Sequence, residues 1–132
     1  MRELIKGRLW QGMAIEAEEL CQNYGNEKAG IHSIISVAWD KKPKLPGQVV
    51  HLSLPVSESA PPRRAWFDLV VRCHVDTHSS LVVCNAGANR SRVFAAAILI
   101  GAYGMDFSKA VALADPPVGQ LMYERLREWA QR

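Results

Sequence analysis

Three residues with chemical potential lie close together near the middle of the chain. Cys84 and Arg90 are separated by the five residues NAGAN, and Ser91 follows directly. A cysteine thiolate is a strong nucleophile, and the planar guanidinium of arginine can bind two oxygens of one phosphate group. A serine hydroxyl can donate a hydrogen bond to sulfur. These residue types at this spacing suit attack by Cys84 on the phosphorus atom of a phosphate ester.

The segments on either side predict how these residues are held. SLVVC (80–84) is continuously apolar, which is typical of a strand buried in a parallel sheet, and SRVFAAAILIGAYG (91–104) predicts a helix. The loop between them must lie over the helix N-terminus, where unpaired backbone N–H groups and the helix dipole attract anions. The same positive environment favours the thiolate form of the cysteine. We therefore predict that the loop binds the phosphate group through Asn85, Ala86, Gly87, Ala88, Asn89 and Arg90.

The rest of the chain alternates between strand-like and helix-like segments. Hydrophobic spacing and turn residues predict strands over 4–11, 30–39 and 48–56, and helices over 14–24, 63–78, 107–114 and 120–132. This alternation predicts an α/β fold with a mostly parallel central sheet of about four to five strands flanked by helices. Ligands bind such sheets beyond the carboxyl ends of the strands. At 132 residues the chain is predicted to form a single domain, 1–132.

Composition narrows the range of partners. Sixteen Lys and Arg against thirteen Asp and Glu give a net charge of +3, and the basic residues form no dense stripe, so no nucleic acid is expected as a partner. The longest apolar run, around 93–103, is much shorter than the roughly 20 residues of a membrane-spanning helix. No membrane association is therefore expected.

The cysteines argue against a disulfide framework or a metal site. Cys21, Cys73 and Cys84 are irregularly spaced and form no CxxC pair, which favours a reducing compartment, and we predict a cytoplasmic protein. His74 and His78 have helical i, i+4 spacing beside Cys73, but no carboxylate with comparable spacing completes a metal-ligand set. We therefore expect no metal and no cofactor.

The segment CNAGANRS matches the Cys-x5-Arg-Ser/Thr signature of the cysteine-based protein phosphatases, and its surroundings resemble the dual-specificity branch. GRLWQG (7–12) resembles the opening strand of that family, and GIHSIISVA (30–38) resembles a later one. VVHLSLPVSES (49–59) resembles the strand that leads into its general-acid loop. The resemblance covers residues 5–114 and implies a dual-specificity phosphatase-like catalytic domain.

The resemblance also implies roles for individual residues. Cys84 would be the nucleophile that forms a phosphocysteine, Arg90 the phosphate clamp, and Ser91 the hydroxyl that assists departure of the thiolate. Glu58 stands where the family usually has an aspartate as general acid, and Asp40 is a weaker alternative for that role. Val83 stands where the family usually has a histidine before the nucleophile.

The implied function is hydrolysis of phosphate monoesters, phosphotyrosine and phosphoserine or phosphothreonine, on a phosphorylated protein substrate. Three alternatives stay open at this point. A phosphate-binding pseudophosphatase is favoured by Val83 and Glu58. A phosphatase for phosphoinositides or RNA 5′ ends would share the chemistry, although NAGAN lacks the extra basic residues that would indicate it. A rhodanese-type sulfurtransferase fits the loop length less well. The sequence makes no prediction of oligomeric state.

Overall fold

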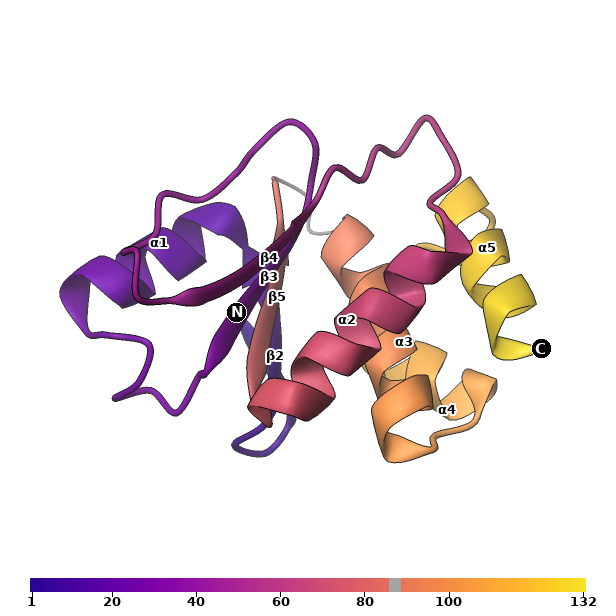
Figure 1. Cartoon of the computed structure of the whole chain (residues 1–132). Coiled ribbons are helices and arrows are strands. Elements are labelled where there is room, and N and C mark those ends of the chain that lie inside the picture. The colour runs from indigo at the N-terminus through magenta and orange to yellow at the C-terminus, as the bar shows by residue number, and fades with distance from the viewer. Residues whose placement is uncertain (86–88) are drawn as a thin grey trace.

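The computed structural model describes residues 1–85 and 89–132. Within these ranges five strands form one sheet in the order β1-β2-β5-β3-β4 (Figure 1). Their bounds are β1 Arg2–Ile5, β2 Leu9–Met13, β3 Ser33–Val37, β4 Val50–Leu54 and β5 Ser80–Cys84. β1 runs antiparallel to β2, and the pairs β2/β5, β5/β3 and β3/β4 are parallel. The predicted mostly parallel α/β sheet is confirmed.

The helices cover the two faces of the sheet unequally. α1 (Ala14–Asn23) lies on one face, and the other face is covered by α2 (Arg64–Thr77) and α3 (Asn89–Tyr103), with α4 (Phe107–Ala114) and α5 (Leu121–Ala130) outside them (Figure 1). The strands β3 and β5 are buried along their whole length, as expected for strands with helices on both faces. None of the helices in the described ranges is long and apolar enough to span a bilayer.

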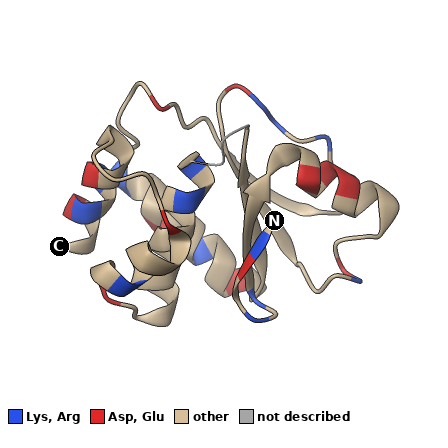
Figure 2. Ribbon diagram, turned by 180° about the vertical axis from the view of Figure 1, so that it is seen from behind, with Lys and Arg blue, Asp and Glu red and all other residues tan. Residues whose placement is uncertain are grey.

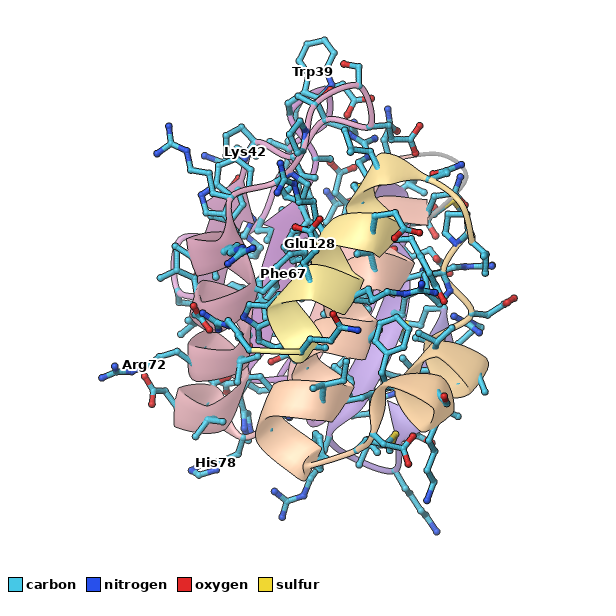
Figure 3. The ribbon with its side chains drawn as sticks, turned by 90° about the vertical axis from the view of Figure 1, so that its right-hand side faces the viewer. Trp39, Lys42, Phe67, Arg72, His78 and Glu128 are labelled. Atoms are coloured by element: carbon cyan, nitrogen blue, oxygen red, sulfur yellow. The ribbon has the colours of Figure 1, made fainter. Side chains whose placement is uncertain are left out.

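The core centres on α3, whose residues from Val93 to Leu99 are all fully buried. The rings of Phe67 from α2 and Phe94 from α3 stack with their centroids 4.8 Å apart, and Figure 3 shows Phe67 lying beside α5. The backbones of α2 and α3 approach closely at Gly101, where an added Cβ would lie 2.7 Å from Cγ2 of Val71. This packing fixes α3 against the sheet, and with it the residues of its first turn.

Two of the differences from the predicted element boundaries bear on the site. The segment 4–11 is a hairpin rather than one strand: the chain turns at Gly7, which has a φ of +70°, and β2 continues to Met13. The weak alternation of this segment hid the turn, since the left-handed backbone that glycine permits is its main signal. The helix α3 begins at Asn89, two residues before its predicted start, so Arg90 and Ser91 both lie in its first turn.

Candidate active site

Cys84 is the last residue of β5, and its side chain is almost completely buried. The backbone N–H of Ser91 donates to the sulfur at 3.3 Å, and the hydroxyl oxygen of Ser91 lies 3.4 Å from it. Both groups come from the first turn of α3, so the sulfur faces the N-terminus of that helix. An amide, a hydroxyl and a helix N-terminus are all groups that stabilise negative charge on sulfur.

Arg90 precedes Ser91 and is also buried, with 5% of its surface exposed. Its Nη1 donates to Oδ1 of Asp40 at 2.7 Å and to the backbone carbonyl of Val56 at 2.9 Å. Its Nε is buried and has no hydrogen-bond partner among the residues that the structure describes. Burial alone lowers the pKa of Arg90, but the hydrogen bond and charge of Asp40 outweigh that effect and raise it. Nη1 of the guanidinium is therefore held by Asp40 and Val56, while Nε is a buried donor without a described partner.

Asp40 follows β3, the strand that pairs with β5 and so lies next to the strand that ends at Cys84. Besides Arg90, it accepts a hydrogen bond from Nδ2 of Asn85 at 3.0 Å. The hydrogen bonds from Arg90 and Asn85 lower the pKa of Asp40 to about 2. A carboxyl with this pKa is ionised near neutral pH and has no proton to give, which argues against Asp40 as the alternative general acid. Its contacts make it a partner of the arginine instead.

The carbonyl of Val56 connects three segments of the site. It accepts from Nη1 of Arg90 and also from the backbone N–H of Trp39 at 3.0 Å. Val56 itself is fully buried and lies two residues before Glu58. One backbone oxygen thus joins the first turn of α3, the loop after β3 and the loop that carries the predicted acid.

Glu58 lies at the rim of a hollow of about 220 Å³ beside Arg90. The described residues that line this hollow are Trp39, Asp40, Ser57, Glu58, Ser59 and Arg90. The loop around Glu58 is shaped by the hydroxyl of Ser57, which accepts from the backbone N–H of Ser59 at 3.2 Å. The Glu58 side chain is exposed and makes no hydrogen bond or ion pair with a described residue. The structure therefore brings Glu58 to the same hollow as the arginine and leaves its carboxyl group accessible.

Trp39 forms the edge of this hollow and is 66% exposed, although large aromatic side chains are usually well buried. Figure 3 shows its ring at the end of the molecule where the loops after the parallel strands gather. An exposed aromatic ring beside a ligand-sized hollow offers a flat apolar surface to whatever enters.

The remaining predicted residues divide into three groups. Asn85 contacts Asp40 as described above, and Asn89 is the first residue of α3. Ala86, Gly87 and Ala88 lie outside the described residues, so their predicted contact with phosphate stays a prediction. Val83 is fully buried in β5 beside Gly12 and Ser36 of the neighbouring strands, and it packs in the core on the α1 side.

Sequence reasoning missed Gln11, which contacts the site from β2. Its Nε2 donates to Oγ of Ser91 at 2.8 Å across 80 residues of sequence, and its side chain is only 2% exposed. Position 11 was predicted only as part of a strand. Its separation from Ser91 leaves no local pattern by which the contact could have been found.

The two histidines at the end of α2 have different surroundings, since His74 is buried and His78 is exposed. Buried His74 bonds through Nδ1 to the hydroxyl of Ser80 at 3.0 Å and through Nε2 to that of Tyr103 at 2.6 Å. Burial lowers the pKa of His74 to about 4, and His78 ends the helix in a left-handed conformation. No group of three or more His, Cys, Asp or Glu residues with metal-site geometry occurs in the described ranges.

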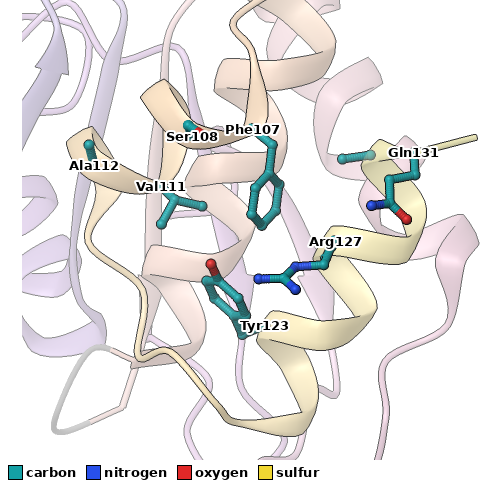
Figure 4. Close-up of a pocket in the computed structure, with 8 residues that line it drawn as sticks. Phe107, Ser108, Val111, Ala112, Tyr123, Arg127 and Gln131 are labelled. Atoms are coloured by element: carbon teal, nitrogen blue, oxygen red, sulfur yellow. The ribbon is translucent and has the colours of Figure 1, made fainter.

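A second, larger hollow of about 490 Å³ lies between α4 and α5 (Figure 4). The guanidinium of Arg127 lies over the rings of Tyr123 and Phe107, at 5.4 and 5.7 Å from their centroids. Its described lining includes no cysteine, histidine or carboxylate. This larger hollow therefore lacks the carboxylates that line the hollow beside Arg90. The charged residues of α1 are all acidic, and those of α3 are all basic (Figure 2).

Comparisons with known proteins find matches by structure but none by sequence. No protein-family model matches the chain, and no curated protein matches it in sequence. Human DUSP28 matches its structure with a TM-score of 0.81 at 18% identity, covering 99% of this chain and 96% of that one. A mouse putative dual specificity phosphatase complexed with zinc tungstate gives 0.79 at 22% identity, with 98% and 85% covered. The human tyrosine phosphatase-like serine/threonine/tyrosine-interacting protein gives 0.77 at 23% identity, with 99% and 95% covered.

The chain therefore has the fold of the dual-specificity phosphatases. The resemblance that CNAGANRS indicated is confirmed at the level of the fold.

Proposed function

We propose that this protein is a phosphatase that hydrolyses phosphate monoesters through a phosphocysteine on Cys84. The observation that carries the proposal is the arrangement of the first turn of α3, where Ser91 contacts the Cys84 sulfur and Arg90 keeps Nε without a partner among the described residues. A phosphate group bound at that nitrogen lies next to a nucleophile at the end of a buried strand. The fold it shares with known phosphatases supports the same chemistry.

The first chemical step transfers the phosphoryl group to the protein. The thiolate of Cys84 attacks phosphorus while the bond between phosphorus and the ester oxygen breaks. Glu58 gives a proton to the departing oxygen, and Arg90 balances the negative charge of the phosphoryl oxygens. The products of this step are an alcohol or phenol and a phosphocysteine.

The second step releases phosphate. Glu58, now a carboxylate, takes a proton from a water molecule whose oxygen attacks phosphorus. The bond between sulfur and phosphorus breaks, and its electron pair returns to Cys84. The hydroxyl of Ser91 donates a hydrogen bond to the departing sulfur without losing its proton.

We further propose a phosphorylated protein as the substrate, carrying phosphotyrosine, phosphoserine or phosphothreonine. The hollow beside Arg90 is small, and the exposed ring of Trp39 and the loop of Glu58 line it. This supports a shallow site that accepts phosphorylated side chains of different length. The three cysteines form no disulfide, which supports a cytoplasmic location.

The test is hydrolysis of p-nitrophenyl phosphate without added metal between pH 5 and 8. Wild type should turn over the substrate and Cys84→Ser should not. Cys73→Ser is the matched control, because Cys73 is half-buried on α2 and takes no part in the proposed chemistry. Equal turnover by wild type and Cys84→Ser would refute a cysteine nucleophile.

A phosphate-binding pseudophosphatase is the second candidate. It is favoured by the ion pair between Asp40 and Arg90, since a carboxylate already contacts the predicted phosphate clamp. One structural neighbour is named a tyrosine phosphatase-like interacting protein, so a protein with this fold can be described by its interactions and not only as a phosphatase. Binding of tungstate or phosphate by folded protein that hydrolyses neither p-nitrophenyl phosphate nor phosphopeptides would favour this candidate.

A further inference from the structure

Gln11 is a polar residue at a buried strand position, where apolar side chains are usual. Residues alternate between the two faces of a strand, so Gln11 lies on the same face of β2 as Leu9, which is fully buried in the core beside α3. A buried amide is destabilising unless its donors and acceptors are paired. The side chain of Gln11 is therefore expected to have specific partners.

The partners of Gln11 fix the direction in which its amide points. Oε1 accepts from Nε of Arg2 at 2.9 Å, and Nη2 of Arg2 donates to the carbonyl of Ala114 at 2.6 Å. Arginine has only donors, so the oxygen end of the amide must face Arg2. Nε2 is then directed at Ser91, where the distance to Oγ is 2.8 Å.

This direction determines the role of the Ser91 hydroxyl. Nε2 of an amide can only donate, so Oγ of Ser91 is the acceptor in that contact. The hydroxyl hydrogen must point elsewhere. Among the described residues, the acceptors within its reach are the carbonyl of Gly12 at 3.3 Å, to which it donates here, and the sulfur of Cys84 at 3.4 Å. When the sulfur is an anion, it is the stronger acceptor of the two.

We propose that Gln11 is a positioning residue that directs the hydroxyl of Ser91 toward the sulfur of Cys84. When Cys84 is a thiolate its sulfur can only accept, and the donors then run from Arg2 through Gln11 and Ser91 to the sulfur. Its effect belongs to the second chemical step, when the bond between sulfur and phosphorus breaks and the electron pair returns to sulfur. This inference rests on the proposed function.

Two substitutions test the direction of the bond. Gln11→Met keeps the size of the side chain and removes the donor, and it should lower kcat for p-nitrophenyl phosphate about tenfold, the effect of one lost hydrogen bond. Gln11→Glu replaces the donor by an acceptor, which turns the Ser91 hydroxyl away from sulfur, and it should lower kcat further. KM should not rise in either variant. Gln22→Met, on the exposed face of α1, is the control and should match wild type.

A double-mutant comparison separates positioning from simple damage to the fold. In a Ser91→Ala background Gln11→Met should have no further effect on kcat, because the hydroxyl that it orients is gone. Rapid-quench measurement should show more phosphocysteine at steady state in Gln11→Met than in wild type. An equal fall of kcat in both backgrounds, or no increase in phosphocysteine, would overturn the proposal.

A readout without turnover keeps this inference separate from the proposed function. The rate at which iodoacetate alkylates Cys84 depends on the thiolate and can be followed from pH 5 to 9. Gln11→Glu should shift this profile to higher pH relative to wild type, and an unchanged profile would count against the role of Gln11. If wild type hydrolyses no substrate, the proposed phosphatase activity is refuted. The pH profile of alkylation then still tests whether Gln11 orients the hydroxyl of Ser91.

Discussion

Asp40 forms an ion pair with Arg90, the arginine that is proposed to bind phosphate. The substitution Asp40→Asn tests how the negative charge of Asp40 affects phosphate binding. Asparagine keeps an oxygen that can accept from Nη1 of Arg90, so the arginine should stay in place. The charge is lost, together with the hydrogen bond that the second carboxylate oxygen accepts from Nδ2 of Asn85. We expect Asp40→Asn to bind inorganic phosphate and tungstate more tightly than wild type, because a bound oxyanion no longer faces a carboxylate across the guanidinium.

The size of the effect follows from the geometry. Two anions on neighbouring edges of one guanidinium stand on the order of 5 to 6 Å apart, where like unit charges repel by about 0.8 kcal/mol in water and about 3 kcal/mol at an effective dielectric constant of 20. The side chain of Asp40 is 32% exposed, so solvent screens much of this repulsion. A repulsion of about 1 kcal/mol corresponds to roughly fivefold tighter binding.

Calorimetric titration with phosphate, checked by inhibition of p-nitrophenyl phosphate hydrolysis, measures this difference. Asp76→Asn is the control, because Asp76 forms an exposed ion pair with Arg72 on α2. The hydrogen bonds from Arg90 and Asn85 hold the pKa of Asp40 at about 2, below its usual 3.8, so the carboxylate is charged above pH 4 and is neutralised only as the pH falls toward 2. The gain should therefore be constant from pH 5 to 8. Unchanged or weaker binding would refute the repulsion argument, and weaker binding would mean that the charge is needed to hold Arg90.

Four other substitutions test separate parts of the structure. Glu58→Gln should lower kcat/KM about a hundredfold for a phosphoserine peptide and much less for p-nitrophenyl phosphate, whose leaving group needs little protonation, and equal losses would exclude Glu58 as the acid. Trp39→Ala should lower kcat/KM several-fold more for a phosphotyrosine peptide than for the phosphoserine one, while Trp39→Phe should restore the preference, because the exposed ring can pack only on an aromatic substrate. Burial lowers the pKa of His74 from 6.5 to about 4, so the unfolded chain takes up the proton first and stability is lost as the pH falls through that window. Denaturant unfolding of wild type should lose about 2 to 3 kcal/mol between pH 7.5 and 4.5 from this source, and His74→Phe should lose that much less. Gly101→Ala should lower the free energy of unfolding by about 1 to 3 kcal/mol through its clash with Val71, and a smaller loss in a Val71→Ala background would confirm that cause.

The sequence predicted those parts of the site that are contiguous in the chain. The strand, the loop and the helix around Cys84 each have a local pattern, and their order alone places the cysteine at a helix N-terminus. Glu58 was found only by the family resemblance, since an acid in a loop between prolines has no pattern of its own. The structure places it beside the arginine but leaves its role as an acid a prediction.

The long-range contacts could not be predicted in the same way. Asp40 is 50 residues from Arg90, and Gln11 is 80 residues from Ser91. Each contact depends on the order of the parallel strands, which brings the ends of β2, β5 and β3 to one edge of the sheet. A polar residue at such an end looks like any other loop or strand residue until that order is known. The hairpin at Gly7 was missed for a related reason, because two short strands with weak alternation resemble one longer strand.

The carbonyl of Val56 has a consequence for how the site responds to a ligand. Because this oxygen accepts from both Arg90 and the backbone of Trp39, the phosphate clamp, the aromatic edge and the loop of Glu58 share one fixed point. The carbonyl is a main-chain acceptor, so it stays available to Arg90 when the side chain of Asp40 is replaced. In the proposed function, phosphate binding by Arg90 and proton transfer by Glu58 would therefore share one backbone contact, two residues before Glu58.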